Sequence, residues 1–470
     1  MGTDKRRRQH VKTYVMAGIA IAILIAVHVL PVPEGLPPVG MRMIGIALIA
    51  ALFWSTEVVP IPVTALIIIF LQSTLGVLPL NTSLGSIAHP VNSLIFVGFV
   101  LSAGLEKFGL DRRISVSIIK IAGRNVRKLL FAMMAIVAVL SMWMSNTSTV
   151  ALVVPIVLSM LAVSKGDNPN MKRAFLIGIA YAGTIGGIAT PVGTPPNPIT
   201  IGFLNEMADI SVSFLDWIII GMPFTIILLP LAWLTLILMY PPEVKEIDIP
   251  DEALVLEETQ HKKSDIRRFG IIFASIVVLW VAESFLPVPA NWLYLVAIGG
   301  SIAMCLPIIG VLSWKELSRE VNWGVLILIG GGLAMGTGLK ESGVIDWLVN
   351  TYLLQLGDVS TPVLIIIVAG VTSLSIMFFC SITATSTAFV PLAITLAIEL
   401  NANPLIVAAA AGIASSFAYL LPANTPPNAI AYASGHFSTG DMMKAGIVLL
   451  VLSIVVFVLI SQLLWPLKFQ

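Results

Sequence analysis

The chain has 470 residues, of which 57% are hydrophobic and 11% are charged, and its mean hydropathy is +0.99. A soluble domain keeps a charged surface, so this composition excludes an ordinary soluble protein and indicates a polytopic membrane protein. The net charge of +1 at pH 7 says nothing about partners, because only the placement of the charges along the chain is informative. The fold class that we predict is all-α, with every backbone polar group satisfied inside the bilayer.

The chain begins with a basic flank, "KRRRQHVK", which is followed by an apolar run over 13–30. This run is long enough to span a bilayer and no small-residue cleavage site follows it, so we predict a retained first helix. Apolar runs of about 18 or more residues predict further spans along the chain. These lie at 41–59, 61–79, 91–110, 173–192, 214–240, 269–286, 292–310, 322–340, 403–421 and 442–465.

Two more apolar runs, 129–163 and 362–400, are interrupted by polar motifs of the same length and a similar residue pattern, "SNTSTVALVVP" at 145–155 and "SITATSTAFVP" at 381–391. Lys and Arg mark the cytoplasmic side of a membrane protein. The first run has basic residues at both ends and the second has none, so we predict two re-entrant hairpins that open to opposite sides. Together with eleven transmembrane helices, this places the N-terminus inside and the C-terminus outside the plasma membrane.

The two halves of the chain also repeat, since "GTPPNP" at 193–198 recurs as "NTPPNA" at 424–429. Odd numbers of crossings and oppositely opening hairpins are typical of inverted-topology repeats, which build secondary transporters with a site at the midplane. We predict an N-terminal segment with the first helix over 1–40 and a cytoplasmic linker over 241–268. The first repeat, 41–240, contains scaffold helices, the inner hairpin 126–165 and the broken helix 173–210. The second repeat, 269–470, contains scaffold helices, the outer hairpin 361–401, the broken helix 403–436 and a last helix.

Each break pairs a threonine with a proline, as Thr194 with Pro195 and Thr425 with Pro426. Threonine suits a helix cap, and proline suits the first helical position because it needs no hydrogen bond there. We therefore predict that a half-helix starts in mid-membrane at each motif. The helix-break residues are Pro195, Asn197, Pro426 and Asn428.

The return arms of the hairpins are predicted to start near Thr147 and Thr383. Four helix N-termini are then expected to converge, each with free N–H groups and the positive end of a dipole, which together suit an anion. Ser and Thr often serve only as contacts between membrane helices, and one Thr-Pro break is often only a kink. Four breaks in two symmetric pairs favour a binding site instead. The histidines are scattered without partners at ligand spacing, so no metal site of this kind is predicted.

These motifs, with "STEVVPIPVTAL" and "IGIAYAGTIGGI", resemble the divalent anion:sodium symporter family, the INDY-type di/tricarboxylate transporters, over nearly the whole chain. The resemblance implies small carboxylate anions as substrates and a homodimer whose transport domain moves as an elevator. It also implies that both hairpin tips bind substrate and help to form two sodium sites. The substrate-binding residues that it implies are Ser145, Asn146, Thr147, Thr194, Ser381, Thr383, Asn424 and Thr425. The first-repeat cation site that it implies consists of Ser141, Ser145, Asn146 and Gly193.

Two positions at the tip lose an oxygen-bearing side chain in the second repeat, because Met377 and Ile382 stand there where Ser141 and Asn146 stand in the first. A hard cation such as sodium prefers several oxygen ligands, and neither Met nor Ile supplies one. Asn424 also stands where the family usually has a small residue. We therefore predict that the second sodium site is lost, and that the chain exchanges C4 and C5 dicarboxylates such as succinate, malate, fumarate and 2-oxoglutarate without sodium.

Three alternatives are carried beside this prediction. The first is a sodium-coupled symporter, with citrate or tartrate among its substrates. The second is an intramembrane hydrolase, which would need a base beside Ser145 or Ser381, and the sequence has no His or Lys near either. The third is a channel. We predict a transporter that is no enzyme, binds no nucleic acid, has the lipid bilayer as its surroundings, and has free thiols at Cys305 and Cys380.

Overall fold

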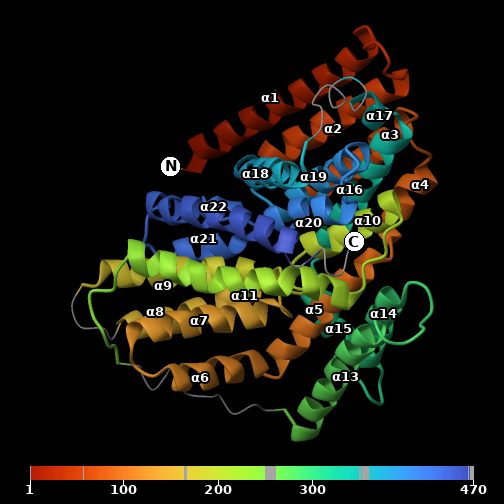
Figure 1. Ribbon diagram of the computed structural model, residues 1–470. Coiled ribbons are helices and arrows are strands. Elements are labelled where there is room, and N and C mark those ends of the chain that lie inside the picture. Colours follow the sequence, from red (N-terminus) through yellow and green to blue (C-terminus); the bar gives the residue numbers. More distant parts are fainter. Residues whose placement is uncertain are drawn as a thin grey trace. The chain divides into compact units, whose positions relative to one another are not determined.

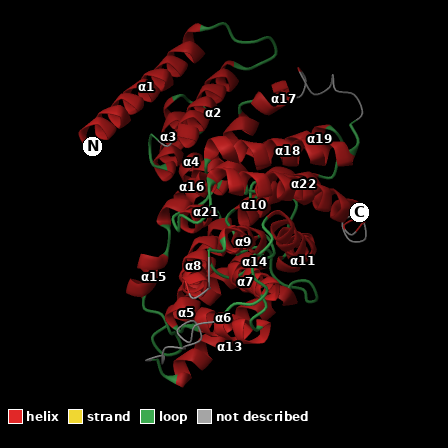
Figure 2. Ribbon diagram, turned by 90° about the vertical axis from the view of Figure 1, so that its left-hand side faces the viewer, coloured by secondary structure: helices red, strands yellow, loops and turns green. Residues whose placement is uncertain are grey.

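The computed structural model describes residues 2–56, 58–162, 167–248, 261–348, 351, 359–463 and 465. All named elements in these ranges are helices, and Figure 2 shows helices joined by loops, so the all-α prediction is confirmed. The chain divides into two compact units, each built from segments of both predicted repeats. The first unit comprises Met1–Asn92, Ile199–Ile210 and Trp323–Gly412, and the second comprises Ser93–Pro198, Ser211–Asn322 and Ile413–Gln470.

The helices are labelled in chain order. Those up to the linker are α1 (Gly2–Val29), α2 (Pro38–Thr56), α3 (Ile61–Thr74), α4 (Leu80–Gly85), η1 (Ser86–Ala88), α5 (Val91–Lys107), α6 (Leu110–Ala122), α7 (Val126–Ser141), α8 (Asn146–Ala162), α9 (Pro169–Gly187), α10 (Pro196–Ala208) and α11 (Phe214–Met239). Those after it are α13 (Lys263–Ala282), α14 (Trp292–Cys305), α15 (Trp314–Glu320), α16 (Trp323–Glu341), α17 (Val344–Leu348), α18 (Thr361–Phe379), α19 (Ile382–Glu399), α20 (Pro404–Ala414), η3 (Pro422–Asn424), α21 (Pro426–Tyr432) and α22 (Thr439–Leu463).

Eight helical segments of the described residues are long and apolar enough to cross a membrane. They are Lys12–Val29, Pro38–Thr56, Leu80–Lys107, Phe214–Met239, Trp323–Glu341, Thr361–Phe379, Ile382–Glu399 and Thr439–Leu463. Shorter apolar helices are Ile61–Thr74, Asn146–Ala162, Trp292–Cys305 and Pro404–Ala414. The multi-pass membrane protein is thus confirmed. The number of eleven crossings stays a prediction, because breaks and tips leave several apolar runs as pieces shorter than a bilayer requires.

Both hairpins form as helix–turn–helix elements with their turns at the predicted motifs. The first is α7 followed by α8, and the second is α18 followed by α19. Asn125 caps α7 by accepting a hydrogen bond from the N–H of Lys128, and Ser381 caps α19 by accepting one from the N–H of Ala384. Cys380, in the second turn, has a left-handed φ of 47°, which is uncommon for a residue other than glycine. The side of the membrane to which each hairpin opens stays a prediction.

In the first unit, α16 packs on α3 and α19 through a face of small residues. A Cβ atom on Gly331 would overlap Ala65 of α3, and one on Gly332 would overlap Thr387 of α19. The glycines therefore allow backbones to approach closely, as is usual between membrane helices. The second hairpin is held against α16 in this way.

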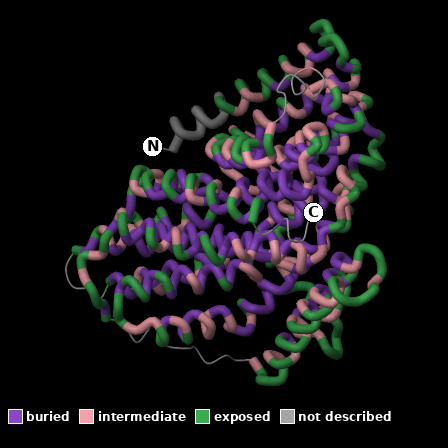
Figure 3. Tube along the Cα trace, viewed as in Figure 1, coloured by how far each residue is buried: buried purple, intermediate pink, exposed green. Residues whose placement is uncertain are grey.

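In the second unit, α9 is buried along most of its length, and purple, buried stretches are frequent in Figure 3 where α7, α9 and α11 lie in Figure 1. Helices α7, α8, α11 and α21 pack around it, and Figure 1 shows α6, α7, α9 and α11 side by side. Glycines again permit the close approach, since a Cβ atom on Gly186 would overlap the backbone of Ala138 in α7. The central helix of this unit is thus the one that ends at the first break.

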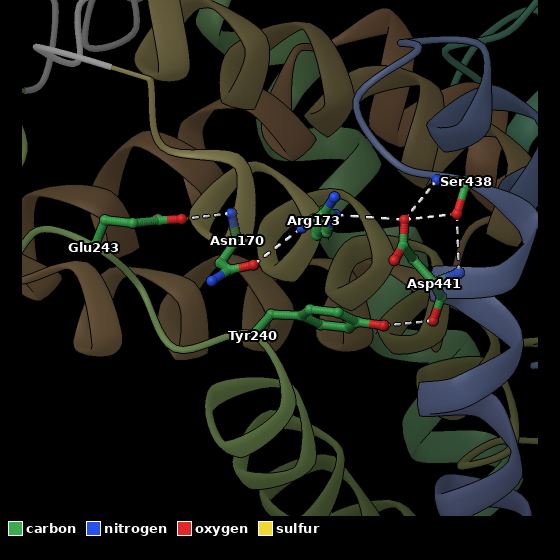
Figure 4. A network of polar contacts seen from close by, with 6 residues as sticks. All are labelled: Asn170, Arg173, Tyr240, Glu243, Ser438 and Asp441. Carbon is green, nitrogen blue, oxygen red and sulfur yellow. Dashed lines mark hydrogen bonds and ion pairs between the residues drawn. The ribbon is translucent and has the colours of Figure 1, made fainter.

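Polar contacts hold the ends of α9, α11 and α22 together (Figure 4). Arg173 at the start of α9 pairs with the carboxylate of Asp441, with Nε 3.3 Å from Oδ2. Asp441 also accepts hydrogen bonds from the backbone and side chain of Ser438, and the hydroxyl of Tyr240 donates to the Asp441 carbonyl over 2.7 Å.

The predicted linker, 241–268, is described only in part, because residues 249–260 lie outside the described ranges. Its first residues pair with the base of the first hairpin. The N–H of Val126 donates to the carbonyl of Lys245 over 3.0 Å, the N–H of Ile247 donates to the carbonyl of Arg124 over 3.0 Å, and Arg124 forms an ion pair with Asp248. The described part of the linker is therefore tied to the hairpin beside it.

Candidate substrate and cation site

The first helix break runs from Gly187, where α9 ends, to Pro196, where α10 begins. The amide nitrogen of Asn197 donates to two carbonyl oxygens of the break, those of Gly187 at 2.8 Å and Thr190 at 2.6 Å. Buried carbonyl groups need such partners inside a membrane protein. Asn197 thus satisfies the unwound backbone of its own break, a role that its motif alone did not specify.

The prediction that α10 starts at Pro195 with a Thr194 cap was wrong in detail. The helix starts one residue later, at Pro196, and the chain before it forms a turn in which the N–H of Asn197 donates to the Thr194 carbonyl over 3.1 Å. The Thr194 hydroxyl instead accepts a hydrogen bond from the side chain of Asn146. Thr194 therefore joins the break to the hairpin tip.

The second helix break follows the same plan. It runs from Ala414, where α20 ends, to Pro426, where α21 begins. The amide nitrogen of Asn428 donates to the carbonyls of Ala418 at 2.6 Å and Leu421 at 3.0 Å, as Asn197 does in the first break. Thr425 caps α21, its hydroxyl accepting from the N–H of Asn428 at 3.5 Å, so both the predicted cap and the predicted start at Pro426 are confirmed.

Three buried side chains join the first tip to the first break, and we call them the tip–break cluster: Ser141, Asn146 and Thr194. The Ser141 hydroxyl donates to the Asn146 amide oxygen over 3.1 Å, and the Asn146 amide nitrogen donates to the Thr194 hydroxyl over 3.3 Å. All three are at most 8% exposed. Asn146 is also the first residue of α8, so the cluster sits at a helix N-terminus.

Glycines leave room for this cluster. A Cβ atom on Gly187 would lie 2.6 Å from the Asn146 amide oxygen, and one on Gly193 would lie 2.9 Å from the Ser141 carbonyl oxygen. Side-chain and carbonyl oxygens therefore crowd around two positions that carry no side chain. Oxygen ligands of this kind suit a hard cation.

The other two residues of the first tip lie on the same turn. The Ser145 hydroxyl accepts from the N–H of Ser148 at 3.0 Å, so Ser145 caps the start of α8. Thr147 is half-buried in the first turn of that helix. Helix N-termini with hydroxyl side chains can bind a carboxylate, because their N–H groups and dipole both favour negative charge.

The second tip belongs to the first unit. Thr383 is buried there, and Ser381 and Ile382 are half-buried. The hydroxyls of Thr385 and Ser386 donate to the carbonyls of Ser381 and Thr383, so much of this motif's polarity is used within its own helix. The convergence of all four helix N-termini stays a prediction, because the tip is described only within its own unit.

Asn424 lies in the second unit, directly before Thr425 and α21, and α21 packs against α8 and α9. Its side chain is 1% exposed, and its amide oxygen has no hydrogen-bond donor among the described residues. A buried amide oxygen without a donor is costly unless a ligand supplies the partner. The buried amide oxygen of Asn428 also lacks a donor among the described residues, but Asn424 is the one that stands where Gly193 of the predicted first cation site stands in the first repeat.

In the second unit, a helical hairpin meets a broken helix at its tip, an arrangement that is typical of secondary transporters of the membrane. A family model described as "Sodium:sulfate symporter transmembrane region" matches residues 11–469. The chain therefore belongs to the divalent anion:sodium symporter family, and the resemblance drawn from its motifs is confirmed. Membership makes the chain a transporter rather than an enzyme, which removes the hydrolase alternative.

Similar proteins carry a more specific name. The "Sodium-dependent dicarboxylate transporter SdcS" of Staphylococcus saprophyticus is 30% identical over 492 residues, which cover 99% of this chain and 94% of the relative. The protein of the same name from Staphylococcus aureus strain USA300 is 32% identical over 461 residues, which cover 92% of this chain and 88% of the relative.

Two solved structures show a similar fold. The Alcanivorax borkumensis YdaH transporter has a TM-score of 0.57 at 13% identity, covering 82% of this chain and 88% of its own. Neisseria gonorrhoeae MtrF has a TM-score of 0.55 at 14% identity, covering 95% of this chain and 94% of its own. At these identities the likeness concerns the fold alone.

Proposed function

We propose that this protein is a sodium-coupled symporter of C4 and C5 dicarboxylates in the plasma membrane. The observation that carries the proposal is similarity over nearly the full chain to proteins named sodium-dependent dicarboxylate transporters. The prediction of sodium-independent exchange is not supported by these names, and the symporter alternative fits them better. The finer features that the family resemblance implies, a homodimer and an elevator motion, belong to the same proposal.

The first sodium ion is proposed to bind at the tip–break cluster. Ser141, Asn146 and the backbone around Gly193 supply oxygen atoms, and Ser145 lies at the same turn. In the described structure the Asn146 amide oxygen accepts only from the Ser141 hydroxyl, which can rotate away to leave that oxygen to an ion. Sodium in this proposal is transported cargo together with the substrate.

The substrate carboxylates are proposed to bind at the helix N-termini beside this ion. Thr147 lies in the first turn of α8, and Thr425 caps α21, which packs against α8. With hydroxyl, amide and N–H donors and no basic side chain in these motifs, an anion binds more favourably when a cation is bound close by. This gives a physical reason for coupling: each charge lowers the cost of burying the other.

The exchange prediction rested on Met377 and Ile382, which supply no oxygen to the second repeat, and on Asn424 as a side chain that fills space. The buried and unpartnered amide oxygen of Asn424 is instead proposed to be a cation ligand of the second repeat. Sodium coupling then does not require an asparagine at position 382.

The test is uptake of labelled succinate into liposomes that contain the purified protein. Uptake into empty vesicles should rise with external sodium and should be lost when potassium or choline replaces sodium. Competition by unlabelled malate, citrate and sulfate then defines the substrate class. Uptake that is indifferent to sodium and requires dicarboxylate inside the vesicle would contradict the proposal and restore the exchanger.

A further inference from the structure

Each break presents one backbone carbonyl to a glycine of the neighbouring long helix. A Cβ atom on Gly221 of α11 would overlap the carbonyl oxygen of Ile188, and one on Gly446 of α22 would overlap that of Tyr419. Ile188 and Tyr419 both lie in the unwound segments, directly after α9 and between α20 and η3. The two breaks therefore rest against the next helix of their repeat in equivalent ways.

The donors that satisfy these two carbonyls differ. The Ile188 carbonyl accepts its shorter hydrogen bond, of 3.0 Å, from the indole N–H of Trp217, one turn before Gly221 on α11, and the Asn197 amide nitrogen lies at 3.4 Å. Met442 occupies the equivalent place one turn before Gly446, and the methionine side chain has no N–H to donate. The Tyr419 carbonyl lies 2.9 Å from the hydroxyl of Tyr181 instead, and that hydroxyl is also 2.7 Å from the Met442 carbonyl.

Tyr181 belongs to α9, in the last two turns before the first break, and it is 1% exposed. Its single hydroxyl proton is shared between the Tyr419 carbonyl of the second break and the Met442 carbonyl of α22, so Tyr181 ties both to the helix that ends in the first break. A buried carbonyl without a donor is costly, so removing either hydrogen bond should loosen the break that it serves. Because the donor to the second break lies on α9, which ends at the first break, this helix links the two breaks.

We propose that Trp217 and Tyr181 are positioning residues for transport, each of which fixes the backbone of one helix break. Trp217 sets the course of the chain toward Thr194, and Tyr181 sets its course toward Asn424 and Thr425. As a role in transport this inference rests on the function proposed above. The hydrogen bonds themselves predict an effect on the breaks that does not depend on which substrate is carried.

Hydrogen–deuterium exchange on the purified full-length protein tests the assignment directly. Trp217→Phe should raise exchange of peptides covering 187–196 and leave 414–425 unchanged, and Tyr181→Phe should do the reverse. The loss of one buried hydrogen bond corresponds to an increase of about three- to tenfold. Tyr181→Phe removes a single oxygen atom, so it decides the second break even if the larger change at Trp217 impairs folding.

Two matched variants control for a general loss of packing. Trp280→Phe removes an equally buried indole N–H, which donates to the Leu293 carbonyl over 2.9 Å between α13 and α14. Tyr240→Phe removes a hydroxyl that donates to the Asp441 carbonyl over 2.7 Å, one residue from the Met442 carbonyl near Tyr181. Both controls should leave exchange in the two breaks as in the unmodified protein.

In liposomes, Trp217→Phe and Tyr181→Phe should raise the half-saturating concentrations of sodium and succinate by about three- to tenfold, with a smaller change in maximal rate. The two controls should leave these concentrations unchanged even if they lower the melting temperature. Four variants with the same kinetic and exchange behaviour would overturn the inference. If the unmodified protein shows no sodium-driven uptake, the proposed function is overturned. The hydrogen–deuterium exchange of the two breaks still tests the positioning roles of Trp217 and Tyr181 separately.

Discussion

Asn146 and Thr194 are joined by a hydrogen bond of 3.3 Å from the amide nitrogen of the first to the hydroxyl of the second. One residue starts the return arm of a hairpin, and the other lies in a helix break 48 residues further along the chain. Because both side chains are buried, the bond fixes the tip against the break. Tip and break therefore act as one structural element, and a change in either should disturb the other.

Replacing Asn146 by Ala should reduce sodium-driven uptake by at least about tenfold, because it removes one oxygen and two hydrogen bonds from a buried site. Labelled succinate uptake measures the effect. Asn125→Ala is the matched control, since Asn125 also starts an arm of this hairpin but lies at its base. The control should cost about 1 kcal/mol of stability through loss of a cap while sodium dependence stays normal. Normal uptake by Asn146→Ala would sink the site assignment.

Replacing Gly187 by Ala should have nearly the same effect as removing Asn146. The new Cβ atom would lie 2.6 Å from the Asn146 amide oxygen, so the side chain must leave its place. Gly270→Ala is the control, because a Cβ atom there meets nothing within 4 Å. In the helix α13 this control should be neutral or stabilising by up to about 1 kcal/mol. If Gly187→Ala takes up as much succinate as Gly270→Ala, the cluster tolerates displacement of Asn146.

The sequence predicted the hairpins and breaks well, because both are local features. A polar motif inside an apolar run favours a turn, and a Thr-Pro pair favours a helix start, which Thr425 and Pro426 provide and Thr194 and Pro195 miss by one residue. The membership of Asn146 and Thr194 in one cluster followed only from family resemblance, since a hydrogen bond between distant segments leaves no mark in local spacing. Tyr181 was not predicted as a functional residue at all, because a tyrosine in an apolar helix is usually a core residue.

The coupling mode was predicted less well, for a physical reason. Whether an amide side chain fills space or offers an oxygen depends on its hydrogen bonds, which residue type does not specify. The amide oxygens of Asn197, Asn424 and Asn428 all lack a donor among the described residues, whereas the amide nitrogens of Asn197 and Asn428 donate to the backbone of their own breaks. The motifs alone do not show which of these side-chain atoms are engaged.

The first hairpin is expected to open to the cytoplasm, which single cysteines can test after Cys305 and Cys380 are replaced by Ser. Arg127 and Asp167 are exposed at the two ends of this hairpin, so Arg127→Cys and Asp167→Cys should both react with an impermeant thiol reagent from inside only. Ser360→Cys, at the exposed start of the second hairpin, should react from outside. Labelling of Arg127→Cys and Asp167→Cys from opposite sides would show a crossing in place of the hairpin.

The contact between Arg173 and Asp441 predicts a change in stability without a change in site chemistry. Asp441→Ala removes the capping interactions with Ser438 as well as the ion pair, so it should cost about 1–2 kcal/mol. Arg173→Met removes the pair and the side-chain bond to Asn170, and should cost less. Thermal unfolding of the purified protein measures both. Half-saturating sodium should stay unchanged, and a large rise in it would mean that these helix ends also shape the site.

The last prediction concerns the second repeat, where Asn424 offers a buried oxygen and Ile382 offers none. If the Asn424 oxygen is a cation ligand, Asn424→Ala should raise half-saturating sodium by about tenfold, which corresponds to about 1.4 kcal/mol of lost binding free energy. The sodium dependence of uptake should also become less steep, since one ion fewer is bound. Asn424→Asp retains an oxygen at this position and should preserve coupling, whereas Asn424→Leu keeps the volume without an oxygen and should behave like Asn424→Ala. Opposite behaviour, with Leu preserving coupling and Asp abolishing it, would mean that Asn424 only fills space, and that sodium binds through the first repeat alone.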